Sequence, residues 1–394
     1  MDNWTRFAMP HYPELQFSLQ EVRAAGKRLK DDLSLDSEVN WRDTHHVFAV
    51  ANSWRDSHYF PMRSVYLSAA YRMRKIGIKG DMAARPKRMA SIRRKLRESD
   101  IHLDRMQDIG GCRAILDDIA GVRSLIGEIN EGFPHRDRRQ WPYIDEPKED
   151  GYRSHHISFE FCPRIKEQSV YEGRRIEFQI RTRLQHSWAT AIEAVSLFNG
   201  EDLKHHHGNA DWLRLFKLMS GEFAHVEGCP IGPGVPNRPL RIAEIKALEA
   251  KLDAISTLEN IRTATTYAET YLYRDGKFFL IVYNNDDHTV AVERYSEILQ
   301  LQARLATIER QIEEGLTRSK VVTVEVSRVE NLVRTYPNYF GDVGVFLNNL
   351  RRIVQGKDAL EFTLIQQARV KVPKPQPLGD IRNLNRRYTR WYPS

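Results

Sequence analysis

The sequence predicts an α+β protein in which a mixed β-sheet flanked by helices precedes a second, smaller α+β domain. Between residues 112 and 198, segments of strand, helix, strand, strand and helix type follow one another, an order typical of a mixed sheet with helices packed on it. The segment at 228–239 contains three glycines and four prolines, which predicts a domain boundary. Because 394 residues exceed one ordinary core, more than one packed unit is expected.

Residues 1–84 are predicted to form an N-terminal helical region. Apolar residues recur at near-helical spacing over 13–35 and again over 43–76, where Pro61 is expected to interrupt the helix. A strongly basic helix is then predicted to begin at Pro86, because the fixed backbone angle of proline suits the first helical position and this position needs no N–H donor.

Residues 85–228 are predicted to contain the mixed sheet. The segment CRAILDD follows two glycines and is apolar, which is typical of a buried strand. The segments HHISFEFCP and RRIEFQIRT alternate or run apolar as strands do, with a turn-like YEGR between them. The expected strands lie at 112–118, 155–163 and 174–182, and the expected helices at 120–133, 184–198 and 211–227.

The chain after the boundary is predicted to form a C-terminal α+β domain at 240–368. Its strand-like segments are separated by turns that contain Gly, Asn and Asp. Helices are expected at 240–256, at 295–315 and over 328–354, with three strands within 264–293 and one at 321–326. Residues 369–394 are rich in proline and basic residues and are predicted to form an extended basic tail.

The composition limits the compartment and the partners. Sixty basic against fifty-two acidic residues leave a formal charge of +8, which favours polyanionic partners such as nucleotides or RNA. Cys112, Cys162 and Cys229 are far apart and form no CxxC pair, as in reduced cytoplasmic proteins. The sequence shows neither a signal peptide nor an apolar run of about 20 residues. A cytoplasmic protein without membrane contact is therefore expected.

Basic residues gather where the basic helix is predicted to begin. Arg85 and Lys87 flank Pro86. Ser91 and Lys95 follow Lys87 at one-turn intervals, so the three side chains are predicted to share a helix face. A helix N-terminus offers unbonded N–H groups and a partial positive charge, to which these cations add. The pattern predicts a polyphosphate site, although a solvated basic face explains this segment alone equally well.

Two carboxylates are candidates for metal binding and catalysis. Asp108 precedes two glycines at the start of a strand, where backbone can closely approach a ligand. Glu177 lies in an apolar strand, with Gln179 and Arg181 on the same side by the two-residue period. Such a carboxylate needs a metal or arginine partner, or has a raised pKa, and either marks a functional candidate. The alternative is that Glu177 pairs with a neighbouring arginine as part of the structure.

Four motifs, met in order along the chain, resemble those of the RelA/SpoT family of (p)ppGpp synthetases. The first is Arg85-Pro-Lys87 with Ser91-Ile92 and Lys95, and the second is Asp108-Ile-Gly-Gly-Cys-Arg113. The third is Pro147-Lys148 with Gly151-Tyr152-Arg-Ser154-His-His156, and the fourth is Glu177-Phe-Gln179-Ile-Arg181-Thr182. Four motifs in this order and spacing are highly specific for the family.

The resemblance implies a nucleotidyltransferase-like sheet and transfer of pyrophosphate from ATP to the 3′-hydroxyl of GDP or GTP. Arg85 and Arg113 are implied to sandwich the adenine, with Lys87, Ser91 and Lys95 on the ATP phosphates. Asp108 and Glu177 are implied to hold Mg²⁺, the expected cofactor. Glu177 is also implied to orient or deprotonate the acceptor hydroxyl, so that its oxygen attacks the β-phosphorus of ATP and AMP leaves.

The same resemblance implies the acceptor side. Tyr152 is implied to stack on the acceptor guanine, and Lys148 and His156 to contact the acceptor phosphates. The remaining acceptor contacts are assigned to Ser154, Gln179 and Arg181. All departures from the family pattern fall on this side. Trp141 and Pro142 replace a basic residue and an aspartate, for which Arg138 and Arg139 just upstream are possible substitutes. Asp150 replaces an asparagine, and an extra histidine, His155, stands beside His156.

Acceptor identity therefore stays open, and three hypotheses follow. The first is a monofunctional alarmone synthetase of the stringent response, since too few residues precede Arg85 for the hydrolase domain of the long family members. The second is a toxin-type pyrophosphokinase that acts on the tRNA 3′ end or on adenine nucleotides and is regulated by the C-terminal domain. The third is a catalytically inactive RNA- or nucleotide-binding regulator, which the presence of Asp108 and Glu177 disfavours. A homo-oligomer is compatible with all three.

Overall fold

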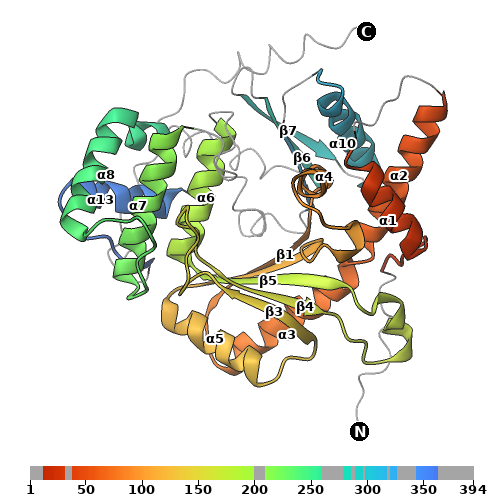
Figure 1. Cartoon of the computed structure of the whole chain (residues 1–394), viewed down its shortest axis with the longest axis horizontal. Coiled ribbons are helices and arrows are strands. Elements are labelled where there is room, and N and C mark those ends of the chain that lie inside the picture. The colour runs from red at the N-terminus through yellow and green to blue at the C-terminus, as the bar shows by residue number, and fades with distance from the viewer. Residues whose placement is uncertain are drawn as a thin grey trace.

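A mixed β-sheet lies at the centre of the protein (Figure 1). The computed structural model describes residues 12–31, 38–198, 209–259, 278–284, 289–295, 298–316, 320–325 and 343–362. Within these residues the central sheet has five strands in the order β1-β2-β5-β4-β3. They are β1 (Gly80–Pro86), β2 (Gly110–Leu116), β3 (Arg136–Pro142), β4 (His155–Glu160) and β5 (Arg175–Thr182). Only β2 and β5 pair in parallel among them, which confirms the predicted mixed sheet and the α+β class.

The two faces of this sheet differ in character. Helices α3 (Tyr59–Lys75) and α5 (Ile119–Glu131) cover one face and lie below the sheet in Figure 1. Ile176, Phe178 and Ile180 of β5 point into the core between the sheet and these helices. Because side chains alternate along a strand, Glu177, Gln179 and Arg181 of β5 project from the opposite face. We call this opposite surface of β1, β2, β4 and β5 the polar face.

Three N-terminal helices form a second core beside the sheet. They are α1 (Leu19–Arg28), α2 (Glu38–Asp56) and the basic helix α4 (Met89–Glu98), joined by the short helix η1 (Leu103–Arg105). The first of them begins at a capping box, in which Ser18 and Glu21 satisfy each other's backbone N–H groups.

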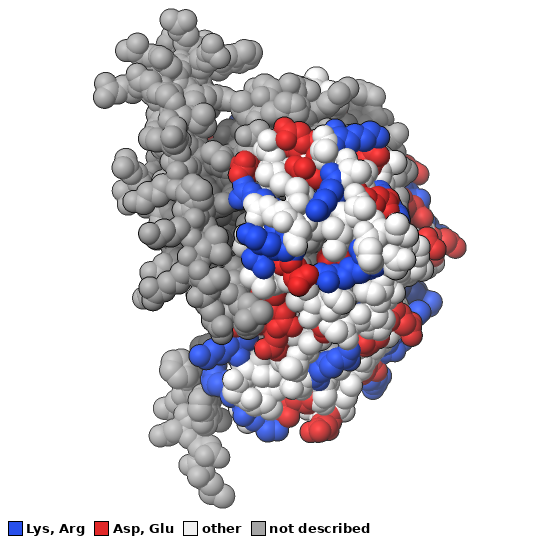
Figure 2. All heavy atoms as spheres, turned by 90° about the vertical axis from the view of Figure 1, so that its left-hand side faces the viewer, with Lys and Arg blue, Asp and Glu red and all other residues white. Residues whose placement is uncertain are grey.

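A third core is built from helices α6 (Arg183–Phe198), α7 (Ala210–Val226), α8 (Arg238–Leu252) and α13 (Gly344–Val354). Helices on both sides of the segment 228–239 thus share one core, in which Phe216, Phe223 and Phe346 lie in contact. The division of the chain into domains stays a prediction. On the face turned to the viewer in Figure 2, basic and acidic side chains are interspersed. The positive charge of the chain is thus not gathered on this face. Ion pairs between α7 and α8 include Arg214–Glu244 and Lys251–Asp211, both at 2.6 Å.

The described C-terminal elements include an antiparallel sheet of order β7-β6-β8. Its strands are β6 (Phe278–Asn284), β7 (Thr289–Tyr295) and β8 (Lys320–Glu325), and helix α10 (Ile298–Glu313) packs on it through a small core around Leu280 and Ile308. The predicted strand at 265–274, the helical segment at 328–342 and the basic tail at 369–394 lie outside the described residues. A separate second domain therefore stays a prediction.

Two local predictions are wrong, the start of the basic helix and the position of the helix break, and strands β1 and β3 were not predicted. Pro86 ends strand β1 and does not begin a helix; α4 begins only at Met89, so Lys87 precedes the helix. Strand β3, which ends at Pro142, was not predicted from the sequence. Both strands lie at the edges of the sheet, where a residue without an N–H donor is tolerated. The long helix breaks at Ser57–His58, and Pro61 lies in the first turn of α3, where its missing N–H costs nothing.

Two further observations concern the helix lengths and the cysteines. No helix in the described ranges is long and apolar enough to span a membrane. Cys112 and Cys229 are buried, Cys162 is half-buried, and all three are free thiols.

Candidate active site

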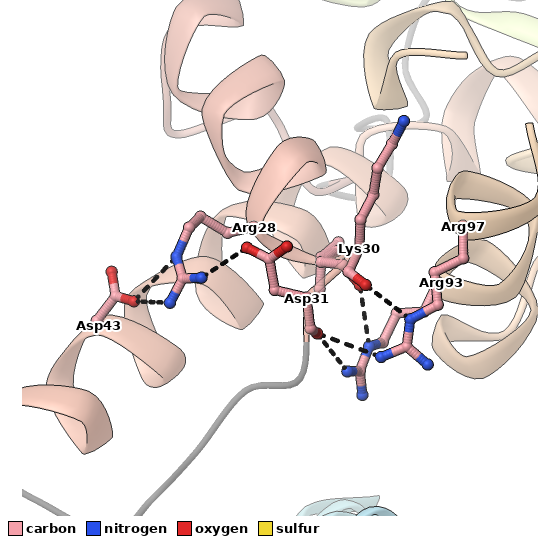
Figure 3. A network of polar contacts seen from close by, with 7 residues as sticks. Arg28, Lys30, Asp31, Asp43, Arg93 and Arg97 are labelled. Carbon is pink, nitrogen blue, oxygen red and sulfur yellow. Dashed lines mark hydrogen bonds and ion pairs between the residues drawn. The ribbon is translucent and has the colours of Figure 1, made fainter. Parts of the chain in front are cut away.

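Helix α4 is held in place by contacts on the side away from the sheet. Its Ile92 and Leu96 pack into the core shared with α1 and α2. Arg93 and Arg97 reach from α4 to the end of α1 and donate hydrogen bonds to the backbone carbonyls of residues 29–31 (Figure 3). These carbonyls directly follow α1, which ends at Arg28, so no further helical turn supplies N–H partners for them. The contacts fix the helix that carries Ser91 and Lys95.

Asp108 is the point at which the first two motifs meet. Lys87 Nζ and Lys95 Nζ donate to the same carboxylate oxygen, Oδ2, at 2.8 and 2.9 Å. The other oxygen, Oδ1, is buried and has no hydrogen-bond partner among the described residues. Burial acts to raise the pKa of Asp108, but the two ammonium groups outweigh burial and hold the pKa below its ordinary value. Asp108 is therefore ionised at neutral pH, with one oxygen left for a cation.

Glu177 lies near Asp108 on the polar face. Its Oε1 accepts a hydrogen bond from Gln179 Nε2 at 2.5 Å, and His156 Nδ1 is 3.4 Å from the same oxygen. Burial raises the pKa of Glu177, and repulsion by Asp108 raises it further, against the lowering effect of Gln179 and the lysines. The two carboxylates are thus close enough to repel each other, and no permanent arginine partner occupies Glu177 in the described structure.

The register of the strands aligns these residues in rows on the polar face. One row is Arg85–Gly111–Glu177 and the next is Arg113–Gln179–His156, each with one residue per strand. Cross-strand partners project from the same face, so side chains in a row are neighbours. Arg113 Nε donates to Gln179 Oε1 at 3.4 Å. Burial, together with the charges of Arg181 and Arg85, lowers the pKa of Arg113 to about 9.

The acceptor-side residues gather around Tyr152. The Tyr152 hydroxyl is 2.8 Å from His156 Nε2, and Lys148 Nζ lies 5.2 Å from the Tyr152 ring centroid. Lys148 also lies 4.7 Å from the ring centroid of Tyr143. Burial, with the neighbouring positive charge of Lys148, lowers the pKa of His156 to about 3, so its imidazole is neutral at neutral pH. The structure therefore brings a lysine, an aromatic ring and a neutral imidazole to one place.

Three predicted acceptor contacts, Ser154, His156 and Arg181, are buried. Ser154 is 0% exposed, and its hydroxyl donates to the carbonyl of Ile180 at 3.2 Å, so it ties the start of β4 to β5. Arg181 is 2% exposed and donates from Nη2 to Nδ1 of His186 on α6. The other predicted ligand contacts of the strands and of α4 are partly exposed; they are Arg85, Lys87, Ser91, Lys95, Arg113 and Gln179.

Several residues at this site are absent from the sequence-based prediction. Arg139, on the unpredicted strand β3, lies in the row of Glu177, and its Cζ is 5.0 Å from the ring centroid of Trp141. Arg138 instead pairs with Glu160 at 2.9 Å and so points elsewhere. The alternation of Arg139 and Trp141 is the signal that could have revealed β3. Nothing local in the sequence singles out His186 as the partner of Arg181.

The carboxylates present fit a magnesium ion. Mg²⁺ in nucleotide-transferring proteins is typically held by one or two carboxylates together with substrate phosphates. Asp108 supplies a buried carboxylate oxygen that has no hydrogen-bond partner in the described residues. Glu177 supplies a second carboxylate, close enough to Asp108 for the two charges to interact. No group of three or more His, Cys, Asp or Glu side chains placed to hold a metal occurs in the described residues.

Residues 84–201 match the model of the region found in RelA / SpoT proteins, which confirms the resemblance carried by the four motifs. A GTP pyrophosphokinase of Photobacterium angustum is 27% identical over 114 residues, which are 29% of this chain and 14% of that protein. A GTP pyrophosphokinase rsh of Brucella melitensis is 31% identical over 109 residues, 28% of this chain and 13% of that protein. The matched part of the chain therefore spans about one seventh of the length of these relatives.

Two solved structures each match less than half of this chain. The small alarmone synthetase 1 of Bacillus subtilis bound to its product pppGpp is 23% identical, with a TM-score of 0.34, and the match covers 43% of this chain and 94% of that one. A GTP pyrophosphokinase family protein of Streptococcus pneumoniae is 20% identical, with a TM-score of 0.34, over 48% of this chain and 89% of that one.

Proposed function

We propose that this chain transfers a pyrophosphoryl group from ATP to the ribose 3′-hydroxyl of GDP or GTP and releases AMP. The observation that carries the proposal is that Asp108 and Glu177 lie close enough for their charges to interact. Lys87 and Lys95 both contact Asp108. The pair lies within the segment that matches the RelA/SpoT region, and the curated relatives over that segment are named GTP pyrophosphokinases.

ATP binds, in this proposal, over the β1–β2 side of the polar face. Lys87 and Lys95 face its phosphates together with Ser91, since both lysines already converge on Asp108. Arg85 and Arg113 lie in adjacent rows there and take the adenine between their guanidinium planes. This arrangement supports the donor side, because phosphoryl-type transfer depends mainly on positioning and on charge neutralisation.

The acceptor nucleotide binds, in this proposal, on the β4–β5 side. Tyr152 stacks on its guanine, while Lys148 and the neutral His156 contact its phosphates. Gln179 lies between the two sides, bonded to both Arg113 and Glu177. The acceptor 3′-hydroxyl then comes to lie next to Glu177, with the β-phosphorus of ATP beyond it.

Glu177 acts as the proton acceptor of the reaction. The acceptor oxygen forms a bond to the β-phosphorus, the bond from that phosphorus to the α-phosphate bridging oxygen breaks, and the hydroxyl proton passes to Glu177. Burial and Asp108 raise the pKa of Glu177, and a raised carboxylate pKa suits a general base. Mg²⁺ held by Asp108 and Glu177 supplies charge neutralisation for the phosphates when it is bound.

A second candidate differs only in the acceptor, which is then the tRNA 3′ end or an adenine nucleotide, with regulation by residues 240–368. The end of β3 favours it, because Trp141 is paired with His156 and covered by Arg139, where a basic residue and an aspartate are usual in the family. A large aromatic beside the acceptor residues changes the shape of the acceptor site without affecting the donor side.

Transfer from γ-labelled ATP tests the proposal. The full chain is incubated with labelled ATP, Mg²⁺ and one of GDP, GTP, ADP or bulk tRNA, and the products are separated. Label in a guanosine product supports the first candidate, and label in tRNA or an adenosine product supports the second. Absence of transfer to every acceptor, with bound ATP demonstrated, overturns both.

A further inference from the structure

Gln179 contacts two groups of opposite charge that belong to the two sides of the site. Its Nε2 donates to Oε1 of Glu177 at 2.5 Å, and its Oε1 accepts from Nε of Arg113 at 3.4 Å. A guanidinium group only donates, and an ionised carboxylate only accepts, so both contacts require the same orientation of the Gln179 amide. The amide therefore lies between the arginine and the carboxylate and carries no charge itself.

The strand register makes a direct contact between Arg113 and Glu177 the alternative arrangement. Glu177 is paired with Gly111, and Gln179 with Arg113, so Arg113 and Glu177 are diagonal neighbours on adjacent strands of the polar face. Side chains as long as those of arginine and glutamate can reach each other across such a diagonal. Gly111 has no side chain that would hinder this approach. Gln179 is thus the side chain whose presence decides whether the two charges meet.

The surroundings of Arg113 favour contact with a carboxylate. Burial, together with the positive charges of Arg181 and Arg85, lowers the pKa of Arg113 to about 9. The carboxylate of Glu193 on α6 offsets part of this effect. A second carboxylate at contact distance would stabilise the guanidinium further, because a buried charge is costly unless it is paired. An ion pair with Glu177 would, however, occupy both groups at once.

We propose that Gln179 is a positioning residue that keeps Arg113 and Glu177 apart, so that the guanidinium stays available to ATP and the carboxylate to the acceptor hydroxyl. The identity of these two ligands rests on the proposed function. Gln179 and His156 both contact Oε1 of Glu177, so in the described part of the chain Oε2 is the oxygen left for a ligand. Gln179 therefore acts through its two neighbours, whereas the family resemblance implied a contact with the acceptor itself.

Two substitutions distinguish separation of the charges from filling of space. Gln179→Ala removes the intervening side chain, so Arg113 is expected to close on Glu177 and the affinity for an ATP analogue to fall by about 10-fold. Gln179→Met fills nearly the same space without either hydrogen bond, so Arg113 stays apart from Glu177 and a loss of at most about 2-fold is expected.

Gln140→Ala is the matched control. The amide of Gln140 also lies between a carboxylate and a donor, since its Nε2 donates to Asp137 at 2.5 Å and its Oε1 is 2.8 Å from Nε2 of His155. Its strand partner is the buried Ile157, so it belongs to the helix-covered face of the sheet. The affinity of Gln140→Ala for the analogue should equal that of the wild type.

A double variant supplies the deciding comparison. Glu177→Gln removes the charge with which Arg113 would pair, so its addition to Gln179→Ala should restore the affinity to within about 2-fold of that of Glu177→Gln alone. A loss of packing would not be restored by a change at Glu177. The analogue carries a methylene group between its α- and β-phosphates, and its binding to the full-length protein with Mg²⁺ is measured by calorimetry.

The outcomes separate this proposal from the proposed function. Wild-type affinity of Gln179→Ala, or an equal loss with and without Glu177→Gln, overturns the separating role alone. Should Gln179→Ala fail to fold, the similarly short Gln179→Ser decides by the same comparison. A wild-type protein that does not bind the analogue overturns the proposed function and this proposal with it, whereas binding and restoration without pyrophosphoryl transfer support the separating role and overturn only the proposed function.

Discussion

Arg85 and Glu177 face each other across Gly111, in one row of three paired strands. Gly111 has no side chain to place between the guanidinium and the carboxylate, and a Cβ built there would meet no atom nearer than the Arg85 carbonyl at 3.6 Å. The row is therefore open at its centre, on the face away from the core. A nucleotide phosphate that passes from the Arg85 side to Glu177 would cross this gap.

Two adjacent glycines are expected to fail in different ways. Gly111→Ala fits without a clash and should leave the melting temperature unchanged, while catalytic turnover falls because the methyl group enters the open row. Gly110→Ala points to the core, where its Cβ would lie 2.6 Å from Ile176 Cδ1, and should cost about 1–3 kcal/mol of stability. Thermal unfolding and kcat/KM of both variants provide the check. Full activity of folded Gly111→Ala would show that no ligand crosses the row.

Glu177→Gln should remove the proton acceptor but leave the shape of the site intact. We expect kcat to fall by about 100-fold or more, while the affinity for ATP changes little. Glu160→Gln on β4 is the matched control, since Glu160 pairs with Arg136 and Arg138 and should leave turnover unaffected. Steady-state kinetics combined with nucleotide binding measure both quantities. Undiminished turnover of Glu177→Gln would refute its catalytic role.

The sequence predicted those site residues that are polar and recur at the regular spacing of a strand or a helix. Glu177 and Gln179 alternate with apolar residues in β5, and this period alone places them on one face. Parallel pairing of β2 with β5 then brings the residues that follow Asp108 beside Glu177. Lys87 and Lys95 were predicted to share one face of a helix, which in the structure begins three residues later than expected. Their common contact with Asp108 was not predicted.

The edges of the sheet and the buried polar pair were beyond local inference. Strands β1 and β3 are half-exposed, polar and closed by prolines, so they lack the apolar period that identifies a strand. The contact of Arg181 with His186 arises because α6 folds back over the end of β5, and only tertiary packing decides this. The shared core of α7 and α13 likewise joins segments that a Gly- and Pro-rich stretch separates in the sequence.

Tyr152 should contribute to acceptor use and little to ATP use. Tyr152→Ala is expected to raise the KM for the acceptor by about 10-fold or more, since stacking on a base contributes roughly 1–3 kcal/mol. Tyr152→Phe keeps the ring and loses the hydroxyl contacts, with His156 and Arg181 among them, so a much smaller effect is expected. Initial rates with each substrate varied in turn give both KM values. Equal losses for the two substrates would count against stacking.

Glu227 is expected to make the folded protein less stable as the pH rises, whereas an ordinary carboxylate with a lowered pKa makes it less stable as the pH falls. It is buried and accepts hydrogen bonds from Thr182 and, at 2.8 Å, from Gln185. Burial raises its pKa to about 7 from 4.5, so the folded state holds a proton that the unfolded state has lost between these values. The associated stability is complete below pH 4.5 and is lost as the pH rises through 7.

Glu227→Gln cannot titrate and should therefore gain in melting temperature over the wild type by about 4 °C more at pH 8 than at pH 5. Glu244→Gln is the control, because the Arg214 hydrogen bond lowers the pKa of Glu244 and its loss should give no gain at pH 8. Differential scanning calorimetry at the two pH values measures the difference. A constant offset between wild type and Glu227→Gln would contradict a raised pKa.

The link between α1 and α4 predicts an effect of a distant arginine on ATP. Arg97 donates to the carbonyls of Lys30 at 2.8 Å and Asp31 at 3.2 Å, and it lies on the helix that carries Lys95 (Figure 3). Arg97→Ala should increase amide hydrogen exchange in α1 and raise the KM for ATP by roughly 2–5-fold, because Lys95 is held less firmly against Asp108.

Arg136→Ala removes a comparably exposed arginine contact, to Glu160 at the far edge of the sheet, and should change neither quantity. The KM for the acceptor should stay at its wild-type value in both variants, since Tyr152 and His156 belong to other elements. Faster exchange in α1 without any change in the KM for ATP would show that α4 keeps its position independently of α1, and that Lys87 and the sheet alone hold Lys95 at Asp108.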